Sequence, residues 1–270
     1  MLQFHADHIG SLIRPTSVSQ AQEQADEGKI SQADLKKIQV EAIADIVKKQ
    51  DANNVRAISS GEFDRKYYFS GFFEKLEGFR EVSPVPWDLA RLSAAPIAAL
   101  KKAGKQYPMA AVCEGKIKHT SSPYTENWHM LRDCVPKERW PECKFTMPPP
   151  CYFHLRLGPG KCYSKDAYAN DEDFFEDLAA AYRKEIRALY DEGLRNLQID
   201  DPTLAYFCSS EMLDGLKKDG EDPQKMFEMY LKAHNDCIAD RPKDMHVGLH
   251  VCRGRQPHAA VVYLMLTFSR

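Results

Sequence analysis

The chain has 270 residues, of which 43% are hydrophobic and 28% are charged, and its formal net charge is −2. Glycine and proline occur at ordinary frequency, so the composition excludes intrinsic disorder and a collagen-like structure for the bulk of the chain. The near balance of basic and acidic residues gives no electrostatic reason to expect a nucleic acid or a membrane as a partner. No apolar run approaches the roughly 18 residues that span a bilayer.

The cysteines and the first residues predict the compartment. Eight cysteines are present, and none of them forms a Cys-x-x-Cys pair. The first eight residues contain neither a basic segment nor an apolar one, so we predict no secretory signal. A disulfide framework is unexpected in a chain of this length without such a signal. We therefore expect reduced thiols and a cytoplasmic protein.

Helix-like and strand-like segments alternate along the chain. The segment 31–53 opens on an N-cap residue, Ser31, and then repeats apolar residues at helical spacing. The segment 172–192 shows the same spacing and stops at Gly193, as helices often do. In chain order, the predicted elements are a strand near 4–11, a helix over 31–53, strands over 55–60, 109–113 and 144–147, a helix over 172–192, a strand over 194–199, a helix over 223–239 and a strand over 245–252. This alternation predicts βα units around a parallel sheet in one α/β domain.

The last predicted strand places two metal-binding side chains on one face. Side chains alternate between the faces of a strand, so the valines and the leucine of the run 245–252 share one face. His250 and Cys252 share the other face, at the carboxyl end of the strand. An imidazole and a thiolate at this spacing are suitable ligands for zinc, which usually takes three or four protein ligands. The alternative is that both side chains only pack in the interior.

The segment 194–202 ends in two carboxylates and a proline. By the same alternation Asp200 shares a polar face with Gln198, whereas Asp201 points to the opposite side. Pro202 ends the strand because it cannot donate a ladder hydrogen bond. At this end of the strand Asp200 can hold an ammonium group or take part in proton transfer. The alternative is that it caps the helix that follows.

Polar groups also follow the two earliest strands. Glu62 comes just after the apolar run 55–60. Near the N-terminus, Ile9, Gly10 and Ser11 provide a glycine that permits close backbone approach and a hydroxyl, which together suit a small carboxylate. Each of these groups is usually only a turn when it occurs alone. Four strand ends with such groups, taken together, fit a zwitterionic amino acid and a soft metal ion.

Five ordered segments of the sequence resemble the catalytic barrel of cobalamin-independent methionine synthase. The resemblance is closest to the shorter single-domain relatives called UROD/MetE-like proteins, and it covers roughly residues 5 to 254. The segments are His8-Ile9-Gly10-Ser11, Ser60-Gly61-Glu62-Phe63, Lys144-Phe145-Thr146-Met147-Pro148, Leu197-Gln198-Ile199-Asp200-Asp201-Pro202 and His250-Val251-Cys252-Arg253-Gly254. Asp201 departs from the Glu that is common there in the family, a shortening that matters little if this side chain faces outward.

The resemblance implies a (β/α)8 TIM barrel and an enzymatic function. It implies transfer of a methyl group from a methyl-folate to a thiol such as homocysteine, with a zinc ion that stabilises the thiolate at neutral pH. A specialised zinc-thiolate alkyltransferase or lyase is the enzymatic alternative. Both functions involve small-molecule substrates and neither a nucleic acid nor a membrane.

The resemblance also assigns roles to individual residues. The family holds its zinc with His, Cys, Glu and Cys ligands, of which His250 and Cys252 would be the first two. The hydroxyl of Ser11 would bind the carboxylate of the amino-acid substrate, and two acids would bind its ammonium group. The full set that the resemblance assigns to substrate binding is Ile9, Gly10, Ser11, Glu62 and Asp200.

The end of the chain departs from the family pattern. The connection from Cys252 to the apolar run 259–268 is shorter than the roughly ten residues that a parallel crossover needs. The residues 255–270 contain neither the missing Glu ligand nor the second Cys ligand. We therefore predict an incomplete barrel over 1–254, with about six of the eight βα units, and a divergent apolar tail over 255–270. A catalytically inactive truncated form is the alternative from another class of function.

Overall fold

The structure is a computed structural model that describes residues 8–252 of the chain. The beginning of the predicted strand near 4–11 and the predicted tail over 255–270 lie outside the described residues. Within the described part, no helix combines the length and the apolar character that a membrane span requires. The class of the fold is α/β, as the sequence predicts.

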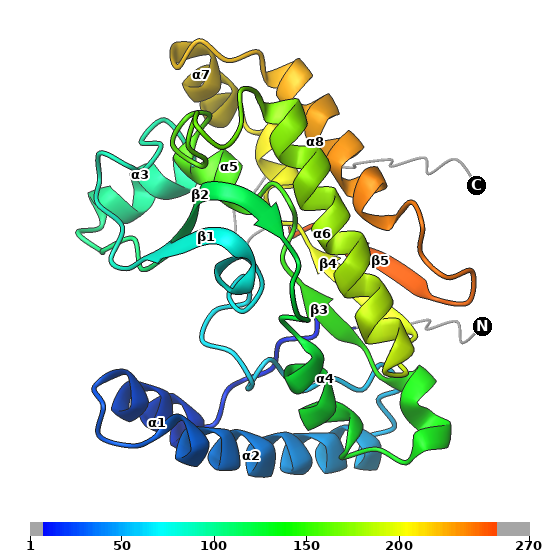
Figure 1. The fold of residues 1–270 in the computed structure, drawn as a ribbon. Helices are drawn as coiled ribbons and strands as arrows, with labels where there is room; N and C mark the ends of the chain where they lie inside the picture. Colours follow the sequence, from blue (N-terminus) through cyan, green and yellow to red (C-terminus); the bar gives the residue numbers. More distant parts are fainter. Residues whose placement is uncertain (1–7, 253–270) are drawn as a thin grey trace.

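A parallel sheet forms the centre of the described chain (Figure 1). Its strands are β3 (Phe145–Met147), β4 (Asn196–Asp200) and β5 (His246–His250), in the order β3-β4-β5. The register places Asp200 opposite His250, so the carboxyl ends of β4 and β5 lie side by side. The predicted strands over 144–147, 194–199 and 245–252 are therefore confirmed in position and in direction.

Two isolated bridges continue the parallel arrangement toward the N-terminus. Ile58 pairs in parallel with Cys143, directly before β3, and Ser11 pairs in parallel with Gly61. The backbone amide of Leu12 also donates to the carbonyl of Gly61 at 3.1 Å. The extended segments around residues 11 and 58–61 thus continue the parallel arrangement beyond β3, and their spatial order follows the sequence. Their carboxyl ends face the same edge as those of β3–β5.

Three long helices connect these extended segments, as the sequence predicts. They are α2 (Gln32–Ala52), α6 (Asp171–Asp191) and α8 (Pro223–Ile238). The helices α6 and α8 pack against each other beside the parallel sheet (Figure 1). Each long helix precedes a parallel segment, which is the βα alternation expected from the sequence.

The ends of α2 and α6 follow from their capping residues. The side chain of Ser31 accepts a hydrogen bond from the amide of Asp34, and Asn170 accepts one from the amide of Asp173. These bonds satisfy amide groups that have no partner inside the first turn. After α6, Gly193 adopts φ of 100°, the left-handed conformation that ends many helices. The predicted ends therefore agree with the structure to within a residue or two.

An antiparallel pair of strands lies apart from the parallel sheet and corrects one prediction. Its strands are β1 (Glu77–Val82) and β2 (Ala110–Lys118). The predicted strand over 109–113 is a strand, but it is part of the longer β2, which pairs with β1 and forms one isolated parallel bridge, from Cys113 to Tyr163. The sequence of β1, EGFREV, is too polar to predict a strand, so the partner that determines the direction of β2 was missed.

The remaining helices surround these two sheets. They are α1 (Thr16–Asp26), α3 (Ala95–Lys102), α4 (Thr125–Arg132), α5 (Tyr152–Leu157) and α7 (Ser210–Lys218), with short 3-10 helices η1 (Phe73–Lys75), η2 (Lys137–Glu142) and η3 (Leu204–Cys208). The pair α1 and α2 lies at the bottom of the view in Figure 1. The elements α5 and η3 follow the carboxyl ends of β3 and β4, so they belong to the edge where the predicted site lies.

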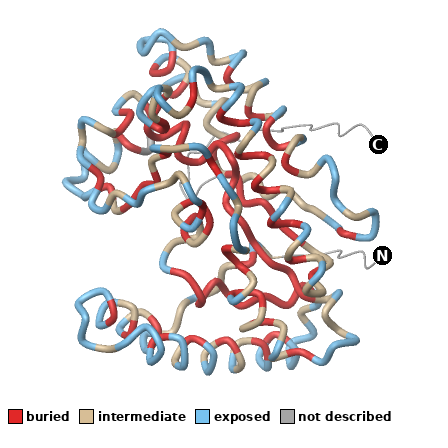
Figure 2. The backbone as a smooth tube through the Cα atoms, viewed as in Figure 1, coloured by how far each residue is buried: buried red, intermediate tan, exposed pale blue. Residues whose placement is uncertain are grey.

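Both faces of the parallel sheet are covered by other parts of the chain. Buried residues run along β3 and β4 and along the inward side of α6 (Figure 2). In β4 the four residues from Leu197 to Asp200 are all buried, whichever face they occupy. Burial on both faces is typical of a parallel strand covered by other elements. Asp200 therefore carries its carboxyl group in a mostly dehydrated environment.

Candidate active site

The predicted site residues meet at the carboxyl edge of the parallel sheet. Thr146 on β3 donates a hydrogen bond from Oγ1 to Oε1 of Glu62 at 2.8 Å. Asp200 ends β4 and stands opposite His250, the last residue of β5. The amide of Asp201 completes this contact by donating to the carbonyl of His250 at 2.8 Å. Residues that are far apart in the sequence are therefore brought to one edge, as alternation along the strands predicts.

Glu62 is held in an unusual backbone conformation. Both Gly61 and Glu62 have positive φ, at 67° and 61°, and Glu62 is only 5% exposed. Left-handed backbone is unfavourable for a residue other than glycine, at a cost of order 1–3 kcal/mol. The guanidinium of Arg14 stabilises this turn by donating to the carbonyl of Glu62 at 3.1 Å, and to that of Arg65 at 2.7 Å. The turn directs the carboxylate of Glu62 toward β3 and away from solvent.

The N-terminal segment lies against the same edge. The side-chain amide of Gln198 donates to the carbonyl of Ile9 at 2.7 Å, which fixes this segment above β4. Gly10 has φ of 98°, and a Cβ there would lie 2.5 Å from Cγ2 of Thr146, so no larger residue fits. Ser11 is half-buried, and within 8–252 its hydroxyl has no hydrogen-bond partner. That hydroxyl is therefore available to a ligand.

Two buried carboxylates share the site, and the charges of Arg65 and Lys144 offset only part of the rise in the pKa of Asp200. Neither Glu62 nor Asp200 forms an ion pair with a lysine or an arginine of the described residues. Burial, and next the negative charge of Glu62, raise the pKa of Asp200 to about 7. Gln198 donates a hydrogen bond to Oδ1 of Asp200 and partly offsets this rise. A pair of buried acids in this state is well suited to an ammonium group, which would remove their repulsion.

Replacing Glu62 with Gln is expected to lower the pKa of Asp200, because the charge that adds to the effect of burial is removed. We expect a decrease of about one pKa unit, which corresponds to about 1.4 kcal/mol. A carbon-13 NMR titration of the Asp200 carboxyl group measures it. The control is Glu211→Gln, the same change at an exposed position. A pKa of Asp200 that stays the same or rises in Glu62→Gln would show that the two carboxyl groups do not interact.

His250 and Cys252 lie at the end of β5 and are both half-buried. Burial, and next the positive charge of Lys144, lower the pKa of His250. The neutral imidazole that results is the form that binds metal ions. Among residues 8–252, these two belong to no group of three or more potential ligands. The described chain thus presents two side chains of types that zinc binds, fewer than the three or four protein ligands of a usual zinc site.

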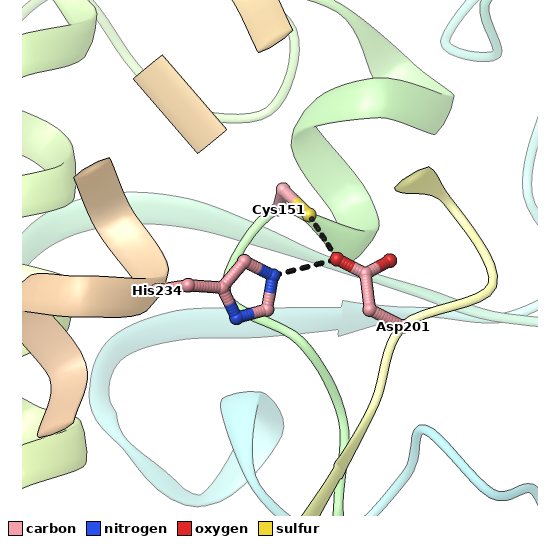
Figure 3. A group of neighbouring side chains, drawn as sticks. All are labelled: Cys151, Asp201 and His234. Carbon is pink, nitrogen blue, oxygen red and sulfur yellow. Dashed lines mark hydrogen bonds and ion pairs between the residues drawn. The ribbon is translucent and has the colours of Figure 1, made fainter. Parts of the chain in front are cut away.

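A second group of polar side chains, which the sequence analysis missed, lies behind this edge (Figure 3). Nε2 of His234 on α8 is 2.6 Å from Oδ2 of Asp201, and Sγ of Cys151 donates to the same oxygen at 3.3 Å. The Asp that stands at position 201, in place of the family's Glu, was expected to matter little if its side chain faced outward. It does lie on the face opposite Asp200, but it is fully buried at 0% exposure, because α5 and α8 cover that face.

Most polar groups of this second cluster satisfy one another, but Nδ1 of His234 is buried without a hydrogen-bond partner among the described residues. The amide and the hydroxyl of Thr203 both donate to Oδ1 of Asp201, the amide at 2.7 Å. Burial alone would raise the pKa of Asp201, but the hydrogen bonds from His234 and Thr203 outweigh it and hold the pKa below its ordinary value. Burial, and next the charge of Asp201, raise the pKa of the Cys151 thiol well above its ordinary value. The carboxylate of Asp201 already accepts hydrogen bonds from Cys151, Thr203 and His234, so we interpret this group as a hydrogen-bond network that joins β4 to α5 and α8.

Comparisons with known proteins bear on this arrangement. No family model matches the chain. The protein YxjG of Bacillus subtilis (strain 168) is 32% identical over 259 residues, and YxjH of the same strain is 30% identical over 251 residues. A crystal structure from Listeria monocytogenes, assigned as a vitamin-B12-independent methionine synthase, superposes with a TM-score of 0.70 at 31% identity and covers 93% of this chain. The chain belongs to the cobalamin-independent methionine synthase family.

The share of each relative's length that the chain covers differs between the relatives. The chain covers 62% of the length of YxjG and of YxjH, and 66% of the Listeria protein. The 5-methyltetrahydropteroyltriglutamate–homocysteine methyltransferase of Vibrio vulnificus (strain CMCP6) is 22% identical over 244 residues, which is 27% of its own length. A B12-independent methionine synthase from Shewanella sp. W3-18-1, solved with selenomethionine, shares the fold with a TM-score of 0.54 at 19% identity. The family is one of methyltransferases of methionine biosynthesis.

Proposed function

We propose that this chain is a zinc-dependent methyltransferase that acts on a thiol amino acid such as homocysteine. Membership of the methionine synthase family supports the reaction class. The observation that carries the substrate class is the pair of buried carboxylates, Glu62 and Asp200, which form no ion pair with a described lysine or arginine. An amino acid brings the ammonium group that this pair lacks, and a methyl-folate is the donor that the resemblance implies.

We also propose that the parallel sheet is part of an incomplete (β/α)8 barrel over 1–254. The support is the order of neighbours, since the segments around residues 11 and 58–61 and the strands β3, β4 and β5 are adjacent in chain order and parallel throughout. In such a barrel the active site lies at the carboxyl ends of the strands. The proposal is supported by Ser11, Asp200 and His250, which lie at or beside the carboxyl ends of these parallel segments.

The proposed mechanism uses the chain's own residues to bind and orient the substrate. The hydroxyl of Ser11 would donate to the substrate carboxylate, and Glu62 and Asp200 would accept from its ammonium group. Neighbouring strands lie roughly 4.8 Å apart, so the ammonium at Asp200 would be close to the next strand end, where His250 lies. The two methylene groups of homocysteine can span that separation.

The metal would be held by His250 and Cys252 among the described residues. Both offer donor atoms that zinc prefers, and the lowered pKa of His250 keeps its imidazole neutral. When bound, zinc would supply a positive charge that keeps the substrate thiol ionised at neutral pH. The position of both ligands beside Asp200 would keep the amino acid and the metal together.

The zinc content of the purified chain tests this proposal. We expect about one tightly bound zinc per chain, as in other catalytic sites of this type, and we expect Cys252→Ser to remove it. Cys208→Ser is the control, because Cys208 is exposed and is not part of the site. Absence of zinc, with Cys252 alkylated as rapidly as Cys208, would refute the metal part of the proposal.

A further inference from the structure

Arg156 stands out among the buried arginines of the described chain. Three arginines are buried there, and two of them face acids: Arg65 lies 3.2 Å from Asp64, and Arg91 lies 3.5 Å from Glu221. Arg156 is 6% exposed and forms no ion pair with any described carboxylate. A guanidinium stays protonated in proteins, so a buried positive charge remains there without a counter-ion.

The contacts that Arg156 does make leave part of its guanidinium free. It stacks on Tyr152, with Cζ 3.7 Å from the ring centroid, and Nη1 donates to the carbonyl of Tyr152 at 3.1 Å. Its Nε and Nη2 groups donate to no described acceptor, and neither is sealed from solvent. The corresponding nitrogens of Arg91, in contrast, are fully enclosed. The N–H groups of Arg156 that have no partner therefore reach accessible space.

Other tyrosines complete the surroundings of Arg156. Tyr68 contacts Tyr152 edge to face, with ring centroids 5.6 Å apart, and Tyr206 lies near enough to interact electrostatically with Arg156. Both Tyr68 and Tyr206 are half-buried, so they border the accessible space. Tyrosine hydroxyl groups donate hydrogen bonds to anions, as the guanidinium does.

The position of this group relates it to the proposed active site. Tyr68 lies six residues after Glu62, and Tyr206 lies six residues after Asp200. Arg156 is on α5, which follows β3. All three therefore come from the segments that follow the carboxyl ends of the parallel strands. A second substrate bound beside the amino acid would be within reach of them.

We propose that Arg156, with Tyr68 and Tyr206, binds an oxyanion group, a carboxylate or a phosphate, of the second substrate, the methyl donor. Arginine forms two parallel hydrogen bonds with such groups, and the aromatic ring under the guanidinium holds its plane in place. The bound anion supplies the negative charge that no described carboxylate provides to Arg156. The assignment of this anion to the methyl donor rests on the proposed function, whereas anion binding itself does not.

Calorimetric titration with inorganic phosphate and, separately, with glutarate tests this proposal. We expect saturable binding of at least one of them, and the stronger of the two identifies the anion as a phosphate or a carboxylate. Arg156→Gln should weaken that binding at least about tenfold, because the charge-assisted hydrogen bonds are lost. Arg156→Lys keeps the charge without the fork of donors, and should give an intermediate loss.

The matched control is Arg187→Gln. Arg187 also lies over a tyrosine ring, that of Tyr190, but it is exposed. We expect no change in anion binding there, and we expect Arg156→Lys to leave the affinity for homocysteine within twofold. No saturable binding to the wild type, or equal binding by the wild type and a folded Arg156→Lys variant, would overturn the proposal. Anion binding through Arg156 in a chain that does not bind homocysteine would keep this site and refute the proposed function instead.

Discussion

Replacing Asp200 with Asn is expected to weaken the binding of homocysteine by at least about 30-fold, or about 2 kcal/mol. The substrate ammonium would then lose one of its two carboxylate partners in a buried site. The remaining acid, Glu62, would face the ammonium from one side only. Asp200 also stands opposite His250, the proposed metal ligand. Isothermal titration of the purified variant with homocysteine measures the loss.

The matched control for this variant is Asp214→Asn. Asp214 is an exposed residue of α7 that forms an ion pair with Lys217 at 4.0 Å, so the same chemical change is made outside the site. We expect Asp214→Asn to bind homocysteine as the wild type does. If Asp200→Asn bound it equally well, the amino acid would not be held by this carboxyl group, and the proposed orientation of the substrate would be wrong.

Replacing Asp201 with Ala is expected to lower the free energy of unfolding by about 3–5 kcal/mol. The buried His234 would lose its hydrogen-bond partner, and the amide and hydroxyl of Thr203 would lose their acceptor. Cys151 would lose its acceptor as well, although a thiol is a weak donor. Urea unfolding followed by circular dichroism measures the change. A loss below about 1 kcal/mol would mean that the network contributes little to stability.

The contribution of Asp201 also depends on pH in a defined direction. Its pKa in the folded chain is below the ordinary value, so the stabilisation is present above the pKa of the unfolded state, about 3.9. It is lost as the pH falls through the lower pKa of the folded state. The difference in stability between the wild type and Asp201→Ala should therefore decrease as the pH is lowered below about 4. A difference that grows in acid would contradict this account.

The sequence predicts the parallel part of the fold because each element carries a local signal. The caps of α2 and α6 are single residues next to a helical repeat of apolar residues, and both are confirmed. The alternation along β4 and β5 likewise predicts that Asp200 and His250 share an edge, because parallel strands align their carboxyl ends. These inferences need only the periodicity of one segment at a time.

The rest of the site depends on contacts that no local pattern encodes. Asp201 meets Cys151, which is 50 positions away in the sequence, and His234, which is 33 positions away. Neither spacing corresponds to a helix or strand period. The left-handed backbone of Glu62 also has no sequence signal beyond the glycine before it, because it is maintained by Arg14 from another segment. Burial of Asp201 could be predicted only once α5 and α8 were known to cover its face of the sheet.

The central claim is that this edge of the sheet holds an amino acid whose thiol is ionised on a metal. Calorimetry in two buffers of different ionisation enthalpy measures the protons released when zinc-loaded protein binds homocysteine and, separately, methionine. The ammonium and carboxylate groups of the two ligands are the same, so any proton from Asp200 cancels in the comparison. We predict that homocysteine releases about one proton more per chain than methionine, the proton of its thiol. Equal release for both ligands would contradict the account.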